Sequence, residues 1–471
     1  MGQGYTRRQF LELAGAGAAG LVLSQAWPVR VSAAEGRRPN VLLILADDLG
    51  YAELGCQGCR DIATPNIDSI AKAGVRFTDG YVSAPLCSPT RAGLMTGRYQ
   101  QRFGHEFNPG GQAQAAENFG LPLTQRTLAE WLKGEGYVTG LVGKWHLGFK
   151  ADYAPTRRGF DEFFGFLGGA HAYLPSGRGA GGDLLRGTEP VAEKEYLTDA
   201  LTREAVAFID RHQAEPFFLC LAYNAVHAPM QGSVEREARF ADIAEPARRT
   251  FATMLAAMDD GVGAVLGRLK EVGLERDTLV VFLSDNGGPT ATTTSRNDPL
   301  RGYKAQVLEG GIRVPFLMRW PGKVPAGEVY THPVISLDVV PTALAAAGVK
   351  IGREAKLDGL DLLPCIGGSR SQQPHKELFW RMGAQAAARV GEWKLVRLAA
   401  GAPALYNLKD DIGEKEDRAQ LMPEKVKELE EAYARWDKEN IDPLWRREPA
   451  QGRARGAARP RARQAARGQG A

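Results

Sequence analysis

The stretch RPNVLLILADDLG (residues 38–50) is a continuous apolar run that ends in two adjacent aspartates. A strand that is buried on both faces of a parallel sheet requires such an unbroken run. Comparable runs are YVTGLVG (137–143), PFFLCLAYN (216–224) and TLVVFLSDNGG (278–288). Helical patterns lie between them, at 123–136 and 245–273. This alternation predicts an α/β sandwich with a mostly parallel central sheet.

The sequence changes in character at about residue 375. Residues 376–411 suggest short hairpin-like strands, and residues 423–439 have the pattern of an amphipathic helix. We therefore expect a main domain over residues 35–374. A smaller α+β subdomain with a short antiparallel sheet is expected over residues 375–445.

The last segment, residues 446–471, holds eight arginines against one glutamate. It lacks apolar periodicity, which predicts a disordered tail that either solubilises the protein or binds polyanions weakly. The net charge of the whole chain is +4, so the rest of the chain is slightly acidic. We therefore expect no nucleic-acid partner for the folded part.

The N-terminal residues 1–34 have the pattern of a twin-arginine export signal. Arg7 and Arg8 precede an apolar run rich in Gly and Ala, which closes with the small-residue pattern Val31-Ser32-Ala33. The run is short and weakly hydrophobic for a membrane span, and no cysteine near the cleavage point offers a lipid anchor. These features predict a bacterial periplasmic or secreted protein, exported folded by the twin-arginine machinery and without a stable membrane anchor.

Oxygen-bearing pairs follow two of the predicted strands: Asp47-Asp48 and Asp285-Asn286. Ligands of open α/β sheets bind outside the carboxyl ends of the strands, so these pairs could meet at one site. Their hard oxygen ligands suit Ca²⁺ or Mg²⁺ rather than Zn²⁺. Each pair taken alone could also be an ordinary turn or capping pair.

The segment CSPTRAGLMTGR (87–98) places a cysteine at a predicted helix start. Ser88 is a capping residue followed by Pro89, so Cys87 is expected just outside the helix N-terminus, where N–H groups favour an anion. Arg91 in the first turns could bind a tetrahedral oxyanion bidentately. A lone cysteine here could equally be a small buried hydrophobe or a reactive thiolate.

The spacing Cys87-x-Pro89-x-Arg91 resembles the signature of the type I sulfatases, which belong to the alkaline phosphatase superfamily and include arylsulfatases and N-acetylgalactosamine-6-sulfatases. The resemblance runs from about Pro39 to about Asp417. Its further segments follow the order of that family: PNVLLILADDLG, TPNIDSIAKAGVRFTDGY, GYVTGLVGKWHLG, RGFDEFFGF, NAVHAPM, LSDNGG, LRGYKAQVLEGGIRVPF and ALYNLKDD. The resemblance implies an alkaline-phosphatase-like fold and a sulfuric ester hydrolase.

The resemblance also implies a site. Cys87 would be converted to formylglycine by a maturation enzyme, and the aldehyde would hydrate to a gem-diol. The ligands of a divalent cation, Ca²⁺ in this reading, would be Asp47, Asp48, Asp285, Asn286 and the modified Cys87. Arg91 would orient the gem-diol, while Lys144 and His146 would contact the nucleophile and the sulfate. His227 and Lys304 would lie on the leaving-group side.

The implied mechanism needs two hydroxyl groups on one carbon. One hydroxyl, activated by Asp285 with the cation bound nearby, would attack sulfur, and His227 assisted by Lys304 would protonate the leaving alcohol. His146 then removes the second hydroxyl proton, the aldehyde re-forms and sulfate leaves. The expected substrate is a sulfated carbohydrate or an aryl sulfate. Two rivals are a phosphonate monoester or phosphodiester hydrolase with the same machinery and a catalytically silent binding homologue.

Further residues are weaker candidates. His105 and His171 lie in loops that could rim the cleft, and Arg301 is a third tentative substrate contact; His105 and His171 could also be plain loop histidines. Cys56 and Cys59 are read as loop residues or a minor disulfide. Cys220 and Cys365 are expected to be buried. Loops 100–120 and 165–190 and the C-terminal subdomain are expected to decide specificity.

Overall fold

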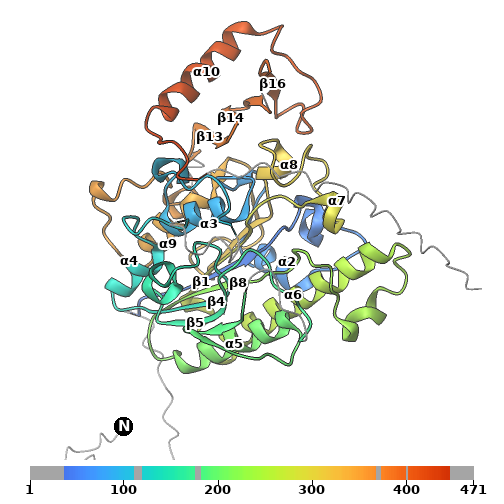
Figure 1. Ribbon diagram of the computed structural model, residues 1–471, viewed down its shortest axis with the longest axis vertical. Coiled ribbons are helices and arrows are strands. Elements are labelled where there is room, and N and C mark those ends of the chain that lie inside the picture. The colour runs from blue at the N-terminus through green and yellow to red at the C-terminus, as the bar shows by residue number, and fades with distance from the viewer. Residues whose placement is uncertain (1–36, 111–118, 176–181, 367–372, 399–400, 446–471) are drawn as a thin grey trace, which may run out of the picture. The chain divides into compact units, whose positions relative to one another are not determined.

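The computed structural model describes residues 37–110, 119–175, 182–366, 373–398 and 401–445. Within them the chain forms a large central sheet (Figure 1). Its strands are β1 (Asn40–Ala46), β2 (Val75–Phe77), β4 (Val138–Lys144), β5 (Glu162–Phe166), β6 (Leu185–Arg186), β7 (Glu189–Pro190), β8 (Phe217–Ala222), β9 (Thr278–Ser284), β10 (Phe316–Arg319) and β11 (Glu328–Tyr330). Their order in the sheet is β11-β2-β10-β9-β1-β8-β4-β5-β6-β7.

The four apolar runs of the sequence form the middle of this sheet. Strands β9, β1, β8, β4 and β5 are paired in parallel, and β10 joins β9 antiparallel. Along β1, Val41, Leu43 and Leu45 lie in one hydrophobic core, and Leu42 and Ile44 lie in the other. Because both faces are covered, every residue of β1 is buried. The predicted mostly parallel sandwich is confirmed.

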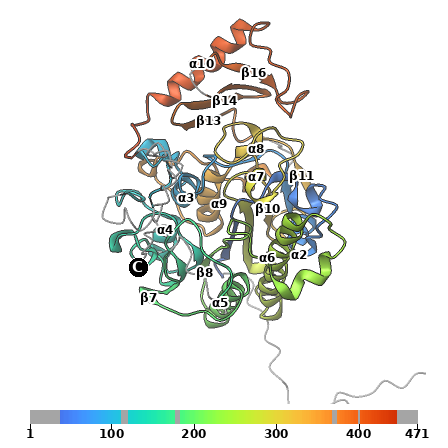
Figure 2. The same cartoon turned by 45° about the vertical axis from the view of Figure 1, so that its right-hand side comes forward.

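Helices cover the two faces of the sheet. One core receives α2 (Pro65–Lys72), α5 (Leu197–Arg211) and α6 (Pro246–Glu271). The other receives α3 (Cys87–Thr96), α4 (Leu128–Gly134) and α9 (Val339–Ala346). The predicted helices at 123–136 and 245–273 correspond to α4 and α6, and the view in Figure 2 shows α6 beside α2.

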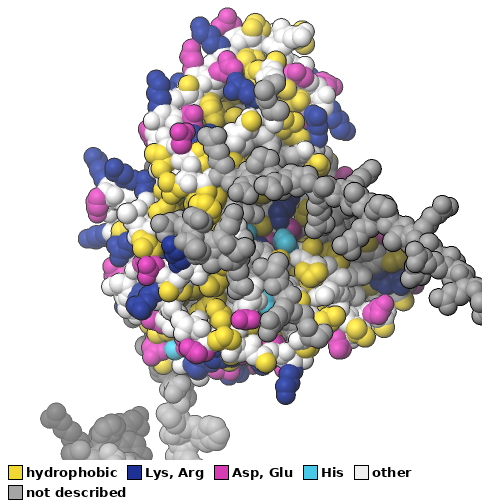
Figure 3. All heavy atoms as spheres, in the orientation of Figure 1, with side chains coloured by type: hydrophobic (Ala, Val, Ile, Leu, Met, Phe, Trp, Pro, Cys, Tyr) yellow, Lys and Arg dark blue, Asp and Glu magenta, His cyan; other side chains and the backbone are white. Residues whose placement is uncertain are grey.

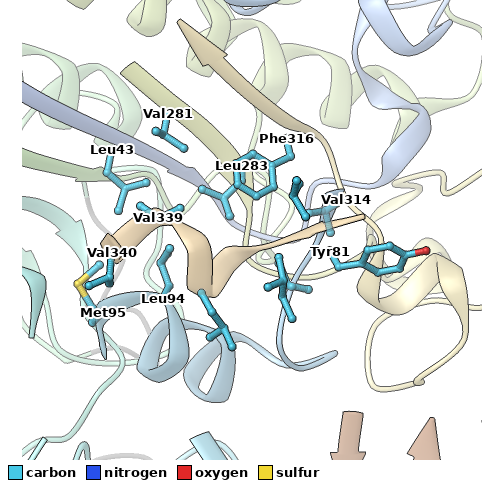
Figure 4. Close-up of a cluster of buried hydrophobic side chains, with 14 of the residues drawn as sticks. Leu43, Tyr81, Leu94, Met95, Val281, Leu283, Val314, Phe316, Val339 and Val340 are labelled. Carbon is cyan, nitrogen blue, oxygen red and sulfur yellow. The ribbon is translucent and has the colours of Figure 1, made fainter. Parts of the chain in front are cut away.

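Helix α3 is held in place by the hydrophobic core that it shares with the central sheet. Its Leu94 and Met95 lie beside Val340 of α9, and Leu43 of β1 lies close to them (Figure 4). Every residue of α3 is buried, including the first. This packing fixes the N-terminus of α3 near the carboxyl ends of β1 and β9, where the candidate site lies.

A separate antiparallel sheet follows in the C-terminal part. It consists of β13 (Glu377–Met382), β14 (Gln385–Val390), β15 (Trp393–Arg397) and β16 (Ala404–Asn407), in sequence order, and α10 (Pro423–Asp437) packs on it. Figures 1 and 2 show β13 and β14 next to the short helix α8 (Glu309–Ile312). The predicted short antiparallel sheet is confirmed. The remaining elements are β3 (Gly80–Tyr81), β12 (Val334–Ile335) and α7 (Thr290–Thr293).

The predicted domain boundaries at residues 34, 374 and 445 stay predictions. The export signal at 1–34 and the Arg-rich tail at 446–471 lie outside the described residues. Among the helices that the structure describes, none combines the length and the apolar character needed to cross a bilayer.

Candidate active site

The two oxygen-bearing pairs meet at one edge of the central sheet. Asp47 and Asp48 follow β1, and Asp285 and Asn286 follow the adjacent parallel strand β9. The backbone N–H of Asp48 donates to Asp285 Oδ1 at 3.2 Å, and Asn286 Nδ2 donates to Asp48 Oδ1 at 2.7 Å. All four side chains are buried. The structure thus brings together the residues that the sequence analysis assigned to a cation.

Cys87 enters this cluster from α3. Its Sγ lies 3.6 Å from Asp47 Oδ1 and 3.2 Å from Lys304 Nζ. The helix begins at Cys87 itself, so the expectation that Cys87 precedes the helix and that Ser88 caps it is wrong. The hydroxyl of Ser88 instead donates to the carbonyl of His146 at 2.6 Å, and Asn108 Oδ1 accepts the Ser88 backbone N–H at 3.0 Å.

Three cations neutralise the three carboxylates. Arg91 directs Nε and Nη2 at Asp285 Oδ2, at 3.0 and 2.8 Å. Lys144, the last residue of β4, donates to Asp47 Oδ2 at 2.6 Å, and Lys304 donates to Asp48 Oδ1 at 2.6 Å. These three pairs balance one another in charge, so the positive charge that would offset the repulsion between a negatively charged ester and a nucleophile depends on a cation bound beside them.

The two motif histidines differ in their exposure to solvent. His146 is buried and has a left-handed φ of 59°, which a non-glycine residue adopts only when its surroundings impose it. His227 follows β8; its Nδ1 donates to the carbonyl of Ala228 at 2.6 Å, and its Nε2 lies 3.6 Å from Asp48 Oδ2. His227 is partly exposed, so it can meet a molecule that arrives from solvent.

The environment of the site shifts the pKa values of Cys87, His146 and Lys304 in different directions. Burial, together with the charge of Asp285, raises the pKa of the Cys87 thiol to about 12. Burial, reinforced by Lys144 and Arg91, lowers the pKa of His146 well below its usual value, so the imidazole is neutral. Burial would lower the pKa of Lys304, but Asp48 and its neighbours raise it well above normal. The unmodified thiol stays protonated at neutral pH, which disfavours a reactive thiolate.

The cluster contains side chains that could hold a metal ion. Ligand atoms of Asp47, Asp48, Cys87 and His227 all lie within 4.8 Å of one another. Asn286 Oδ1 is buried, and no group in the described residues forms a hydrogen bond with it. A buried amide oxygen without a donor, beside several carboxylates, is the environment that Ca²⁺ or Mg²⁺ prefers.

The tentative substrate contacts have different surroundings in the structure, and the expected contact of His171 with substrate stays a prediction. His105 is fully buried, with Nε2 2.6 Å from Ser88 Oγ and its ring against Trp445, so it supports α3 and does not rim the cleft. His171 is partly buried, its Nδ1 lies 2.7 Å from the carbonyl of Ala172, and its ring lies 5.2 Å from that of Phe166.

Arg301 is committed to the C-terminal part of the chain. It donates to the carbonyl of Glu414 at 2.7 Å and to the Tyr406 hydroxyl at 3.3 Å. Its guanidinium therefore serves first to connect the loop that carries Lys304 to the antiparallel sheet.

The remaining cysteines are free in the structure. Cys56 and Cys59 are half-buried, and burial with the charge of Asp68 raises the pKa of Cys56 to about 12. Cys220 is buried as expected. Cys365 is only partly buried, contrary to expectation, because it ends a short 3₁₀ turn (Leu363–Cys365) outside the main sheet.

A cavity of about 470 Å³ opens beside Lys304. The residues that line it include Leu86, Phe107, Asn108, Tyr303, Lys304 and Ala305. In Figure 3 a histidine lies beside lysine or arginine and acidic side chains in the middle of this face of the molecule. The sequence analysis missed the role of Asn108 beside Cys87; its only signal was its place in the loop expected to shape the cleft.

The fold is an α/β sandwich whose central sheet carries a cluster of carboxylates, cations and a cysteine at the carboxyl ends of its strands. A family model described as Sulfatase matches residues 39–349, and one described as N-sulphoglucosamine sulphohydrolase, C-terminal, matches residues 303–431. The chain belongs to the sulfatase family and has its alkaline-phosphatase-like fold. It is therefore a sulfuric ester hydrolase.

Individual relatives agree with this assignment. Steryl-sulfatase of Mus musculus is 34% identical, over 73% of this chain and 67% of that protein. N-acetylgalactosamine-6-sulfatase of Sus scrofa is also 34% identical, over 76% of this chain and 71% of that protein. The crystal structure of Ps i-CgsB superposes with a TM-score of 0.82 at 39% identity, covering 87% of this chain and 95% of that one. The same protein has been solved in complex with k-i-k-neocarrahexaose.

Proposed function

We propose that this protein is a formylglycine-dependent sulfatase that removes sulfate from a sulfated carbohydrate, with a bound divalent cation. The observation that carries the proposal is the position of Cys87. Its side chain lies at the N-terminus of α3, 3.2 Å from Lys304 Nζ and 3.6 Å from Asp47 Oδ1. A nucleophile that attacks a negatively charged ester needs positive charge close by, and the Lys304 ammonium group supplies part of it.

Conversion of Cys87 to formylglycine accounts for this position better than a free thiol does. With a pKa of about 12, the thiol supplies almost no thiolate at neutral pH. The hydrated aldehyde would instead supply one hydroxyl group to attack sulfur and a second whose proton is lost when sulfate is released. A maturation enzyme that oxidises the thiol is therefore an expected partner.

Asp47, Asp48, Asp285 and Asn286 would hold the cation together with the modified Cys87, and we expect Ca²⁺. The bound cation would supply positive charge next to the nucleophile and the sulfate oxygens. The buried amide oxygen of Asn286, which has no donor among the described groups, supports this assignment.

The chain's own residues divide the remaining work. Arg91 and Lys144 would bind the sulfate oxygens and orient the nucleophile, because both are fixed by buried carboxylates. Neutral His146 would accept the proton of the second hydroxyl. On the partly exposed side, His227 and Lys304 would protonate and stabilise the leaving oxygen.

A sulfated carbohydrate is the substrate that we favour. The cavity beside Lys304 has room for a group larger than the sulfate, and aromatic side chains that suit a sugar face, Phe107 and Tyr303, line it. The similar protein Ps i-CgsB was solved with an oligosaccharide. The twin-arginine pattern with Arg7 and Arg8 supports a periplasmic or secreted location, where such polymers are met.

The first test is the mass of the tryptic peptide Phe77–Arg91 from protein made in its native host. A peptide lighter by the change from CH₂SH to CHO is expected. An unmodified thiol in active protein would overturn the proposal.

Activity assays separate the rivals. Initial rates on an aryl sulfate should far exceed those on a phenyl phosphonate, and the reverse would favour the phosphonate monoester hydrolase. Cys87→Ser and the control Cys87→Ala should both abolish turnover, whereas turnover by either variant at the wild-type rate would refute the formylglycine mechanism. A wild-type protein from the native host that keeps an unmodified Cys87 and turns over neither substrate class would favour the silent homologue.

The location has its own test. Replacing Arg7 and Arg8 with lysine should leave the protein in the cytoplasm, as measured by fractionation. Unchanged export of that variant would exclude the twin-arginine route.

A further inference from the structure

The loop from residue 301 to residue 308 presents Lys304 to the active site. Lys304 Nζ lies 2.6 Å from Asp48 Oδ1 and 3.2 Å from Cys87 Sγ. The other end of its side chain belongs to a segment with no regular secondary structure of its own. The position of the ammonium group therefore depends on whatever fixes this loop.

The residue after Lys304 is held in an uncommon conformation. Ala305 has a φ of 71°, the left-handed region, which a residue with a Cβ adopts only when its neighbours impose it. Its backbone N–H donates to the carbonyl of Pro85 at 2.8 Å, two residues before Cys87. This bond ties one side of the Ala305 residue to the segment that leads into α3.

The other side of Ala305 is held by the C-terminal sheet. Gln385, the first residue of β14, donates from Nε2 to the Ala305 carbonyl at 2.9 Å. Its Oε1 accepts the backbone N–H of Val307 at 3.3 Å. One side-chain amide thus makes two hydrogen bonds to the backbone of the Lys304 loop, so its contact is directional and cannot be replaced by apolar packing.

The hairpin that carries Gln385 is itself anchored on the main body. The N–H of Gly383, in the turn between β13 and β14, donates to Glu106 Oε1 at 2.9 Å. Gln101 Nε2 donates to the carbonyl of Arg381 at 2.8 Å. Both anchors come from the segment that follows α3, so the hairpin connects that segment to the Lys304 loop.

We propose that Gln385 is a positioning residue for Lys304. Its amide fixes the left-handed turn at Ala305, and this turn directs the Lys304 ammonium at the leaving oxygen of the sulfate ester. The proposal rests on the proposed function above, in which Lys304 stabilises that oxygen through a charge-assisted hydrogen bond. It gives the C-terminal sheet a part in catalysis without any direct contact with substrate.

The test uses a series of aryl sulfates whose phenol leaving groups differ in pKa. A good leaving group such as 4-nitrophenolate needs little help from Lys304, whereas 4-methoxyphenolate needs more. Gln385→Ala should lower kcat/KM by about tenfold or more for 4-methoxyphenyl sulfate and by less than about threefold for 4-nitrophenyl sulfate. Gln385→Glu should behave like Gln385→Ala, because a carboxylate of nearly the same size cannot donate to the Ala305 carbonyl.

Gln101→Ala is the matched control. It removes one amide hydrogen bond between the same hairpin and the main body but does not touch residues 301–308. It should leave the dependence on leaving-group pKa as in the wild-type protein. A uniform loss across all substrates in the Gln385 variants, or the same dependence in Gln101→Ala, would overturn the positioning role.

Hydrogen exchange gives a second readout that does not depend on activity. Peptides covering residues 302–308 should exchange faster in Gln385→Ala than in the wild-type protein or in Gln101→Ala, because the Val307 amide loses its acceptor. Unchanged exchange there would overturn the proposal that Gln385 fixes the loop of residues 301–308. A wild-type protein without sulfatase activity, in contrast, would refute the proposed function, and the role of Lys304 with it, even if exchange changed as expected.

Discussion

Lys394 is the centre of a buried ion cluster that joins the C-terminal sheet to the main domain. Replacing it with methionine tests how much this cluster contributes to the free energy of unfolding. Lys394, in β15, lies 2.7 Å from Glu309 Oε1 and 2.9 Å from Glu414 Oε1, and all three side chains are fully buried. Arg313 also contacts Glu309, at 3.2 Å. Methionine has a similar length, so Lys394→Met removes the charge without opening a large cavity.

The expected cost follows from the geometry and from the pKa of Glu309. Burial alone would raise this pKa, but the charges of Lys394 and Arg313 outweigh it, and the pKa falls from 4.5 to about 2. A shift of that size corresponds to about 3 kcal/mol of stabilisation. Removing one partner of a buried ion pair costs about 3–5 kcal/mol. We expect Lys394→Met to lower the free energy of unfolding at pH 7.5 by about 3 kcal/mol.

Urea unfolding followed by fluorescence measures this difference. Lys409→Met is the control, because Lys409 and Glu392 form a pair of 3.6 Å in which both side chains are mostly exposed. That variant should cost less than about 1 kcal/mol. If Lys394→Met costs no more than the control, the cluster does not hold the two parts together as argued.

The pH dependence provides an internal check of the same prediction. Because the pKa of Glu309 is lower in the folded protein, its contribution is fully present above pH 4.5 and is lost as the pH falls toward 2. The difference in stability between the wild-type protein and Lys394→Met should therefore shrink on acidification. A difference that grows below pH 4.5 would contradict the assigned sign.

Three further predictions concern the site. Arg91→Lys keeps the charge but cannot maintain both hydrogen bonds to Asp285 and the one to the Lys144 carbonyl. We therefore expect kcat/KM on 4-nitrophenyl sulfate to fall about 100-fold. A decrease of less than about threefold would contradict this reasoning. Burial lowers the pKa of His105 to about 3 from 6.5, so its contribution is present above pH 6.5 and lost on acidification. Between pH 7 and pH 4 the free energy of unfolding, measured with urea, should therefore fall by about 3 kcal/mol less in His105→Gln than in the wild-type protein. Equal decreases in the two proteins would argue against a buried neutral imidazole. Exhaustive chelation should lower both activity and Tm, with recovery on adding Ca²⁺; full activity in protein shown to be metal-free would remove the cation from the proposal.

Much of the fold can be predicted from the apolar runs, because a strand that is buried on both faces consists of consecutive apolar residues. The run from Asn40 to Ala46 became the fully buried β1, and the hairpin pattern after residue 375 became the antiparallel sheet. The position of Cys87 relative to its helix could not be read in this way. Ser88 has a capping side chain, but Asn108, distant in sequence, accepts its N–H instead.

The local sequence by itself determined which groups gather at the carboxyl ends of the strands, because strand ends and motif spacing are local properties. Asp47 and Asp285 follow adjacent parallel strands, as the apolar runs indicate, whereas the place of Arg91 beside them was implied by the family resemblance. Only the tertiary structure decided which polar residues face the substrate and which support others. His105 and Arg301 have the same chemistry as site residues, yet packing turns one toward Ser88 and the other toward the C-terminal sheet. Such partners come from segments far apart in the chain, and their contacts leave no periodic signal in the sequence.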